Sequence, residues 1–271
     1  MPSSPRASYG KWFDILLAIP LAGYLLLIAG LVCAIFLAIT PGEVSAALAD
    51  HDIWDAILLS MITSTLSTFL SVVVAIPAGY ILSRHRFWGH SLADTLLDLP
   101  IVLPPLVMGL CVLLFFSTGV GYWLDRGIVE EGLFIYQPLG IVLVQFIVGC
   151  AFAVRVIKSG FDALDPSYEE VAMTLGAGRW QTFYKVTLAN VAPAILAGAV
   201  ISWARIFGLF GPVLLVAGTM RGRTEIMPTT IYLEQSIGHL GVALVIGAMM
   251  IVISMAMLIL FKRFGGKGLI W

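Results

Sequence analysis

The residues of this chain that could do chemistry are few, and the densest group of them lies in one polar segment. Residues 169–188 read EEVAMTLGAGRWQTFYKVTL and contain two acids, two bases, two glycines and three aromatic residues. The segment lies between two long apolar runs in a chain that is 60% hydrophobic. Paired charges and projecting aromatic rings favour contact with a partner molecule.

The rest of the chain offers little reactive chemistry. No Gly-x4-Gly-Lys-Ser/Thr motif occurs, so any ATP hydrolysis is expected from another chain. The four histidines and three cysteines show no metal-ligand spacing, and the apolar runs contain no Ser/His or His-Glu constellation. We therefore expect a protein that is not an enzyme, with no metal and no cofactor. These scattered residues are His51, His85, His90, His239, Cys33, Cys111 and Cys150.

Composition indicates the environment of these residues. The chain has 271 residues, a mean hydropathy of +1.00 and 11% charged residues, whereas soluble domains carry about 25%. The sequence predicts an integral membrane protein. The net charge of −1 gives no reason to expect a nucleic acid partner.

A membrane-spanning helix needs about 20 mostly apolar residues. Stretches of that length predict an all-α protein with about six transmembrane helices, since alternating ten-residue segments of a barrel are absent from the sequence. The expected spans are 13–39, 54–82, 96–116, 138–157, 190–217 and 239–261.

The distribution of Lys and Arg predicts which side each connection faces. With the N-terminus inside, the cytoplasmic pieces hold eleven of these residues and the outer loops hold three, Arg126, Arg221 and Arg223. Both ends, 1–12 and 262–271, are then expected in the cytoplasm. The transmembrane domain is 13–261, its segment 158–188 is cytoplasmic, and the loop 118–137 forms a short ordered external piece.

The cytoplasmic segment has a predictable local shape. Asp165-Pro166 is a favourable helix start, and Gly176 and Gly178 end that helix. A second short amphipathic piece follows through Trp180 and Phe183, so we expect helix, glycine turn, helix under the membrane. Two simpler explanations stay open: Glu170 can be the acid of a capping box with Ser167, and the aromatic residues can anchor the segment in the lipid interface.

The spacing of this segment resembles the EAA motif of ABC-importer permeases. Glu170-Val171-Ala172, Gly176 after three residues, and Val186-Thr187-Leu188-Ala189 after nine more match its spacing, with Val171, Val186 and Ala189 as departures from Ala, Ile and Pro. In that family the segment forms coupling helices between spans four and five that dock on a separate ATPase. The resemblance implies that the ATPase-coupling residues are Glu169, Glu170, Ala172, Leu175, Gly176, Ala177, Trp180 and Phe183.

Two further stretches are candidates for the walls of a translocation path. DLPIVLPPLVMGL (98–110) concentrates prolines in span three, where either a plain kink or a path is possible. Arg205, expected near the middle of span five, costs about 2.5–3.5 kcal/mol in lipid and should face a wet interior or a subunit contact unless it snorkels. The pathway candidates are Pro104, Pro105, Arg205, Gly208, Phe210 and Gly211.

Residues 203–233 also resemble the molybdate, tungstate and sulfate permeases, with Leu209 in place of the usual acid. The resemblance implies the permease subunit of an ABC importer in the cell (inner) membrane, working as a homodimer with ATPase subunits, a soluble binding protein and surrounding lipid. A divalent oxyanion is the expected solute. The alternatives are a permease for another solute, of polyamine, iron or thiamine type, or an ion-coupled secondary transporter, which would need intramembrane acids or broken inverted repeats.

Overall fold

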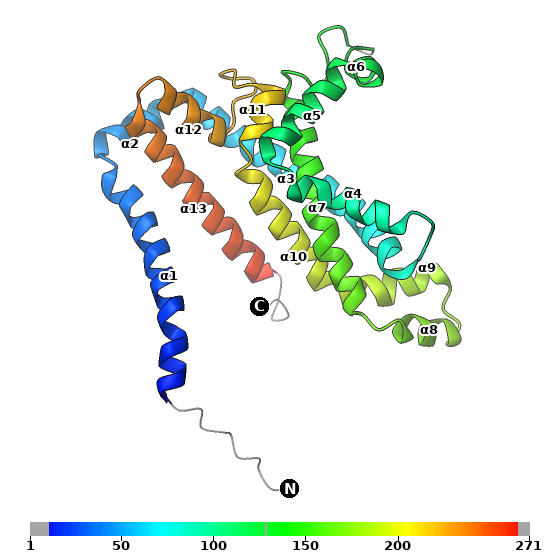
Figure 1. The fold of residues 1–271 in the computed structure, drawn as a ribbon. Helices are drawn as coiled ribbons and strands as arrows, with labels where there is room; N and C mark the ends of the chain where they lie inside the picture. Colours follow the sequence, from blue (N-terminus) through cyan, green and yellow to red (C-terminus); the bar gives the residue numbers. More distant parts are fainter. Residues whose placement is uncertain (1–10, 128, 265–271) are drawn as a thin grey trace.

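A computed structural model of the protein describes residues 11–127 and 129–264, and every regular element in that part of the chain is a helix (Figure 1). The all-α prediction is thus confirmed. The expected end segments 1–12 and 262–271 fall mostly outside the described residues. The elements are α1 (Lys11–Ala38), α2 (Pro41–Ala49), α3 (His51–Arg84), α4 (His90–Val102), α5 (Pro105–Ser117), α6 (Gly119–Arg126), α7 (Pro138–Ala163), α8 (Ser167–Thr174), α9 (Arg179–Thr182), η1 (Phe183–Thr187), α10 (Leu188–Phe207), α11 (Gly211–Ala217), α12 (Met227–Ser236) and α13 (Leu240–Phe264).

Within the described residues, five helices are long and apolar enough to cross a membrane, and a sixth span exists if one bent pair is counted as one. The helical stretches that qualify on their own are Phe13–Ala38, His51–Arg84, Pro138–Ala163, Arg179–Phe207 and Leu240–Phe261. The number of spans agrees with the expectation from hydropathy. Span four is six residues longer than expected, because α7 continues to Ala163.

Span three is not the continuous helix that the sequence predicted. It consists of α4 and α5, which meet at 113°. Leu103 is extended (φ −64°, ψ 138°) because a residue before proline disfavours the helical region. Pro104 then has no N–H for the helix ladder, and Pro105 occupies the first turn of α5, where a proline is tolerated.

Span five is also interrupted, whereas one helix over 190–217 was expected. α10 ends at Phe207, and α11 begins only at Gly211. At its other end the helix is longer than predicted, because α9, the π-helical turn η1 and α10 follow one another without a break from Arg179. The second amphipathic piece, which was expected as a separate helix, is therefore continuous with α10.

Small polar residues hold the centre of the bundle together along a serine seam, formed by Ser64, Ser67 and Ser71 of α3, Gln145 of α7 and Ser202 of α10. The Ser67 hydroxyl donates to the Val142 carbonyl at 3.1 Å, and the Gln145 amide nitrogen lies 3.3 Å from the Ser64 hydroxyl. The Ser202 hydroxyl donates to the Gly149 carbonyl at 2.9 Å. Small residues let membrane helices approach closely, and their hydroxyls then bond across the interface.

The two interrupted spans pack against each other through their second halves. A Cβ added to Gly109 of α5 would lie 2.7 Å from the Pro212 Cα of α11, and one added to Gly211 would lie 3.2 Å from Leu106. α5 and α11 therefore touch nearly backbone to backbone. The breaks at Pro104 and at Gly208 are brought to the same part of the molecule.

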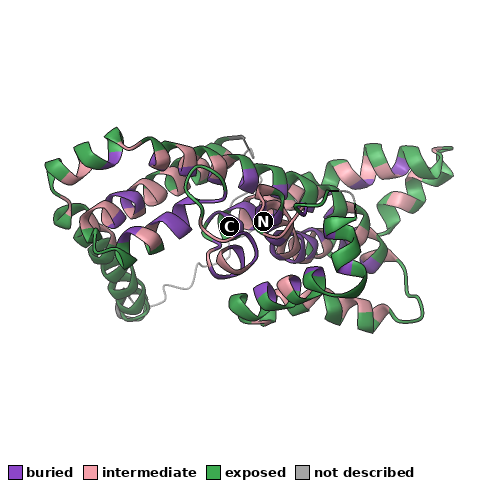
Figure 2. Ribbon diagram, turned by 90° about the horizontal axis from the view of Figure 1, so that it is seen from above, coloured by how far each residue is buried: buried purple, intermediate pink, exposed green. Residues whose placement is uncertain are grey.

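The two ends of the bundle carry different short helices. In Figure 1, α1 starts and α13 ends on the lower side, where α8 and α9 also lie, while α2, α6 and α12 lie on the upper side. The external loop 118–137 was expected to be ordered, and it contains α6, whose Asp125 accepts the Phe134 amide at 2.7 Å. Buried residues gather in the middle of the bundle and exposed ones at its periphery (Figure 2).

Candidate coupling site and translocation path

The short helix α8 begins close to the predicted position. The Asp165 carboxylate accepts a hydrogen bond from the Ser167 amide at 2.9 Å. Hydrogen bonds from the backbone and the side chain of Ser167 lower the pKa of the Asp165 carboxyl. The capping box proposed for Ser167 and Glu170 is not formed, because α8 has no side-chain cap bond and Ser167 is already inside the helix. Glu170 is thus left without the structural role that was its simpler explanation.

The glycine turn after α8 has the predicted left-handed conformation at one of its two glycines. Gly176 adopts φ 89°, which only glycine takes without strain, and the Ala177 amide donates to the Ala172 carbonyl at 3.1 Å. Gly178 has a negative φ of −70° and precedes α9 instead. Gly176 therefore ends one helix, and Gly178 starts the next.

The predicted coupling residues divide into an outward and an inward group. The outward group offers a mixed acidic, aliphatic and aromatic surface, since the Leu175 and Trp180 side chains are 83% and 74% exposed. Trp180 also stacks on Tyr184 at 6.1 Å between ring centroids. The exposed members are Glu170, Leu175, Gly176 and Trp180, and the half-buried ones are Glu169, Ala172, Ala177 and Phe183.

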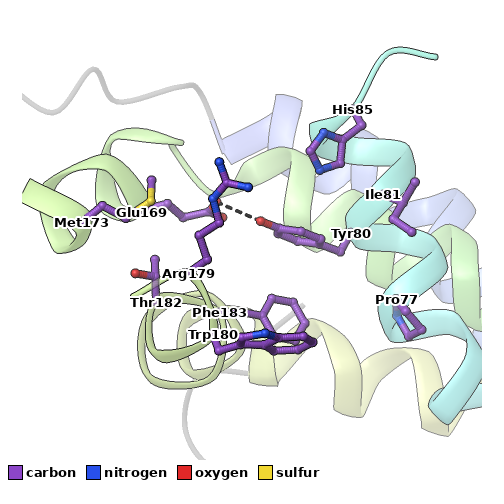
Figure 3. A pocket seen from close by; sticks show the side chains of 10 residues that line it. All are labelled: Pro77, Tyr80, Ile81, His85, Glu169, Met173, Arg179, Trp180, Thr182 and Phe183. Atoms are coloured by element: carbon purple, nitrogen blue, oxygen red, sulfur yellow. Dashed lines mark hydrogen bonds between the residues drawn. The ribbon is translucent and has the colours of Figure 1, made fainter. Parts of the chain in front are cut away.

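Glu169 and Phe183 of the inward group, together with Trp180, line a cavity of about 520 Å³ between the end of α3 and α8–α9 (Figure 3). Tyr80 and His85 line its α3 side, whereas Glu169, Arg179 and Phe183 line the opposite side. The Tyr80 ring meets the Phe183 ring edge-on at 4.9 Å. In Figure 3 the Tyr80 hydroxyl points at the Glu169 carboxylate across this space.

The structure brings most of the pathway candidates together at the two helix breaks. Pro104 and Pro105 are exposed where α5 starts, and Gly208 is exposed where α10 ends. Gly211 is buried against Leu106. The backbone at both breaks has carbonyl and amide groups outside a helix ladder, which in a membrane is tolerated where the backbone lines a cavity or is buried in protein.

Arg205 lies close to the break in span five. It lies in the last turn of α10, because the helix ends two residues later, and its side chain is exposed on the surface of this chain. The guanidinium carbon sits 5.5 Å from the centroid of the Phe152 ring, which gives the charge a cation–π partner. The Phe210 ring is half-buried and lies 5.3 Å from the Tyr232 ring, between centroids.

The arginines of the opposite end are engaged with other side chains. Arg221 forms an ion pair with Glu234, which His239 also contacts at 3.0 Å, and Arg223 donates to Gln137 at 3.0 Å. Free positive charge that would attract an anion is thus reduced at Arg221. In the same region Glu225 is 3% exposed, and burial raises the pKa of its carboxyl.

Sequence reasoning missed two sets of ion pairs, one that fastens the coupling segment to α3 and one that joins α4 to α7. Arg84, the last residue of α3, pairs with Glu169, and Arg155 of α7 pairs with Asp94 and Asp98 of α4. Charged residues at the ends of apolar runs were assigned to orientation alone. Their partners lie 57 to 85 residues away in sequence, so no local pattern points to them.

Comparison with known proteins agrees with this architecture. Residues 71–267 match the family described as binding-protein-dependent transport system inner membrane component. The sulfate transport system permease protein CysW of Escherichia coli (strain K12) is 35% identical over 86% of this chain and 81% of its own length. The molybdate/tungstate transport system permease protein WtpB of Thermococcus kodakarensis is 36% identical over 63% of both chains. Among solved structures, a chain of a bacterial alginate ABC transporter has a TM-score of 0.76 over 95% of both chains at 19% identity, which shows a shared fold.

Proposed function

Because the chain belongs to the family of binding-protein-dependent transport system inner membrane components, we propose that it forms the translocation path of an importer driven by ATP. ATP is hydrolysed by separate ATPase subunits, since the sequence has no phosphate-binding Gly-Lys-Ser/Thr loop. A soluble binding protein delivers the solute on the opposite side. Two copies of the chain line the path, with both termini in the cytoplasm.

The observation that carries this proposal is the exposed surface of α8, the turn that follows it and the start of α9. Large apolar side chains there, Leu175 and Trp180 above all, lie outside the bundle core with an exposed acid, Glu170, beside them. Contiguous exposed apolar side chains with polar neighbours are typical of a protein–protein contact. The matched spacing of the EAA motif favours an ATPase as that partner.

The solute that we propose is a divalent oxyanion of the sulfate, molybdate or tungstate class. The named relatives at about 35% identity transport sulfate or molybdate/tungstate. The two helix breaks around Pro104 and Gly208 supply exposed non-helical backbone, the kind of element that membrane transporters use to contact solutes. A path for another small solute is the alternative that the assay below decides.

In the proposed cycle the ATPases close on ATP and draw the α8 segments of the two copies together. The bundle opens toward the binding protein, and release of ADP resets it. The Arg205 side chain, exposed on a single chain, then faces the path or the second copy.

The test is purification of the chain together with the ATPase and the binding protein whose genes lie next to its own, followed by reconstitution into liposomes. We expect ATP-dependent uptake of sulfate, molybdate or tungstate, and loss of both uptake and ATPase co-purification after deletion of 166–178. The double substitution Leu175→Ser/Trp180→Ala should weaken co-purification without changing thermal stability, because both side chains are exposed. Normal coupled transport by the deletion variant, or uptake driven by an ion gradient without ATP, would refute the proposal.

A further inference from the structure

The two acids of α8, Glu169 and Glu170, are adjacent in the sequence but lie in different surroundings. The Glu169 side chain is 13% exposed and engaged within the chain. Glu170 is exposed, and its side chain makes no hydrogen bond or ion pair with any residue that the structure describes. Of these two neighbouring acids, Glu169 is thus bound within the chain and Glu170 is available to a partner molecule.

The inward acid is held from the last turns of α3. The Arg84 Nε donates to Glu169 Oε1 at 3.2 Å, and the Tyr80 hydroxyl donates to Oε2 at 3.3 Å. The same guanidinium donates from Nη2 to the Leu164 carbonyl at 2.8 Å, just after α7 ends. We call Arg84, Tyr80 and Glu169 the α3–α8 bridge. It connects α8 to the two helices that form the centre of the bundle.

The attraction within this bridge is stronger than that of an ordinary surface ion pair. The Arg84 and Glu169 side chains are only 12% and 13% exposed, so water screens their attraction poorly. Beside the bridge lies the cavity of about 520 Å³ instead of tight packing. A displacement of the coupling segment therefore reaches α3 mainly through the bridge, which holds α8, and the Tyr80–Phe183 ring contact, which holds η1.

The hydrogen-bond ladder of α3 is interrupted just before the residues that form the bridge. Pro77 lies inside α3, where it lacks an N–H for the Val73 carbonyl and favours a bend. Tyr80 and Arg84 follow at three and seven residues, on the same face of the helix as Pro77. The last two turns of α3, which carry the bridge, thus follow a position where a bend is favoured.

We propose that the α3–α8 bridge passes movement between the coupling segment and α3, with Arg84 and Glu169 as positioning residues and Glu170 as the acid that meets the partner. This inference rests on the proposed function, because it assigns to α8 the movement imposed by an ATPase. The spacing of the motif alone does not distinguish the acid that transmits movement, Glu169, from the acid that contacts the partner, Glu170.

The test uses the purified complex of this chain with its ATPase and binding protein in lipid nanodiscs. Hydrolysis is measured without and with the solute-loaded binding protein, and the readout is the ratio of the two rates. Glu169→Gln should lower this stimulation by about 2- to 30-fold, the range expected for a residue that couples two sites, while the ATPase still co-purifies. A purely structural role would reduce assembled complex but leave the ratio of the remainder unchanged.

Further variants make the result specific. Tyr80→Phe keeps the ring contact and removes only the hydroxyl, so it should lower the ratio less and decides the matter if Glu169→Gln fails to assemble. Arg84→Gln/Glu169→Gln should be no worse than the more affected single variant, because both act on one bridge. Arg86→Gln removes a charge from an exposed neighbour that has no hydrogen bond or ion pair to a described residue, and should leave the ratio unchanged.

The possible outcomes distinguish a failure of the proposed function from a failure of the proposed role of the α3–α8 bridge. If the wild-type chain neither binds an ATPase nor supports stimulated hydrolysis, the proposed function fails. If the wild type is stimulated and Glu169→Gln and Tyr80→Phe match it, the bridge has no coupling role. Glu170→Gln should instead lower ATPase co-purification at an unchanged ratio, and the reverse pattern for the two acids would overturn the assignment.

Discussion

The close contact between the two interrupted spans allows a sharp test at Gly109. In Gly109→Ala the new Cβ would lie 2.7 Å from the Pro212 Cα and 3.2 Å from Leu215 Cδ1, whereas ordinary contact begins near 3.4 Å. The nearest atom is backbone, which no side-chain rotation can remove. α5 and α11 must therefore separate by about 0.7 Å, the difference between the first distance and the last.

Overpacking of this kind costs about 1–3 kcal/mol, while alanine in place of glycine gains about 1 kcal/mol in a helix. The matched control is Gly247→Ala in α13, where an added Cβ meets no described atom within 4 Å. We expect Gly109→Ala to melt below this control by about 2–12 °C, taking 2–4 °C for each kcal/mol in a chain of this size.

The assay is thermal unfolding of both variants in the same detergent, followed by solute uptake in liposomes. Uptake should fall in Gly109→Ala, because its clash displaces the half-helix that starts at Pro105, and it should persist in Gly247→Ala. Equal melting temperatures, or a higher one for Gly109→Ala, would show that α5 and α11 do not pack as closely as the structure indicates.

Two other predictions concern buried polar groups. Gln145→Leu removes the amide that bonds Ser64 of α3 and the Ile206 carbonyl of α10, so it should destabilise the bundle by about 0.6–1.7 kcal/mol. The readout is a lower melting temperature, and an unchanged melting temperature would contradict a stabilising role of the serine seam. Burial raises the pKa of Glu225, so its stabilising contribution is complete below the unfolded value near 4.3 and is lost as pH rises through the folded value. Glu225→Gln should therefore gain stability relative to wild type as pH rises, and parallel melting curves from pH 4 to pH 8 would contradict this.

Local features of the sequence predicted a good part of this protein. Six apolar stretches predicted the number of spans, since the thickness of the bilayer sets the length of a spanning helix. The left-handed turn at Gly176 was equally predictable, because one residue type tolerates that backbone conformation best. Both properties depend on residues next to one another in the chain.

The interruptions of spans three and five were less accessible to sequence reasoning. Pro104 and Gly208 are local signals of a break, but a hydropathy window averages over an interruption of two or three residues. That the two breaks meet depends on the contact of Gly109 with Pro212, which are 103 positions apart in the sequence. No local pattern encodes such a pairing.

The direction of the two acids at the start of α8 shows the same division. The sequence determined that acids, a glycine turn and aromatic residues follow one another at the spacing of a docking motif. Only the tertiary structure decided that Glu169 turns inward to Arg84 and Glu170 outward, because the rotation of α8 about its axis is set by a partner 85 residues away on α3. Local chemistry specifies which groups a helix carries, and long-range packing specifies what each of them touches.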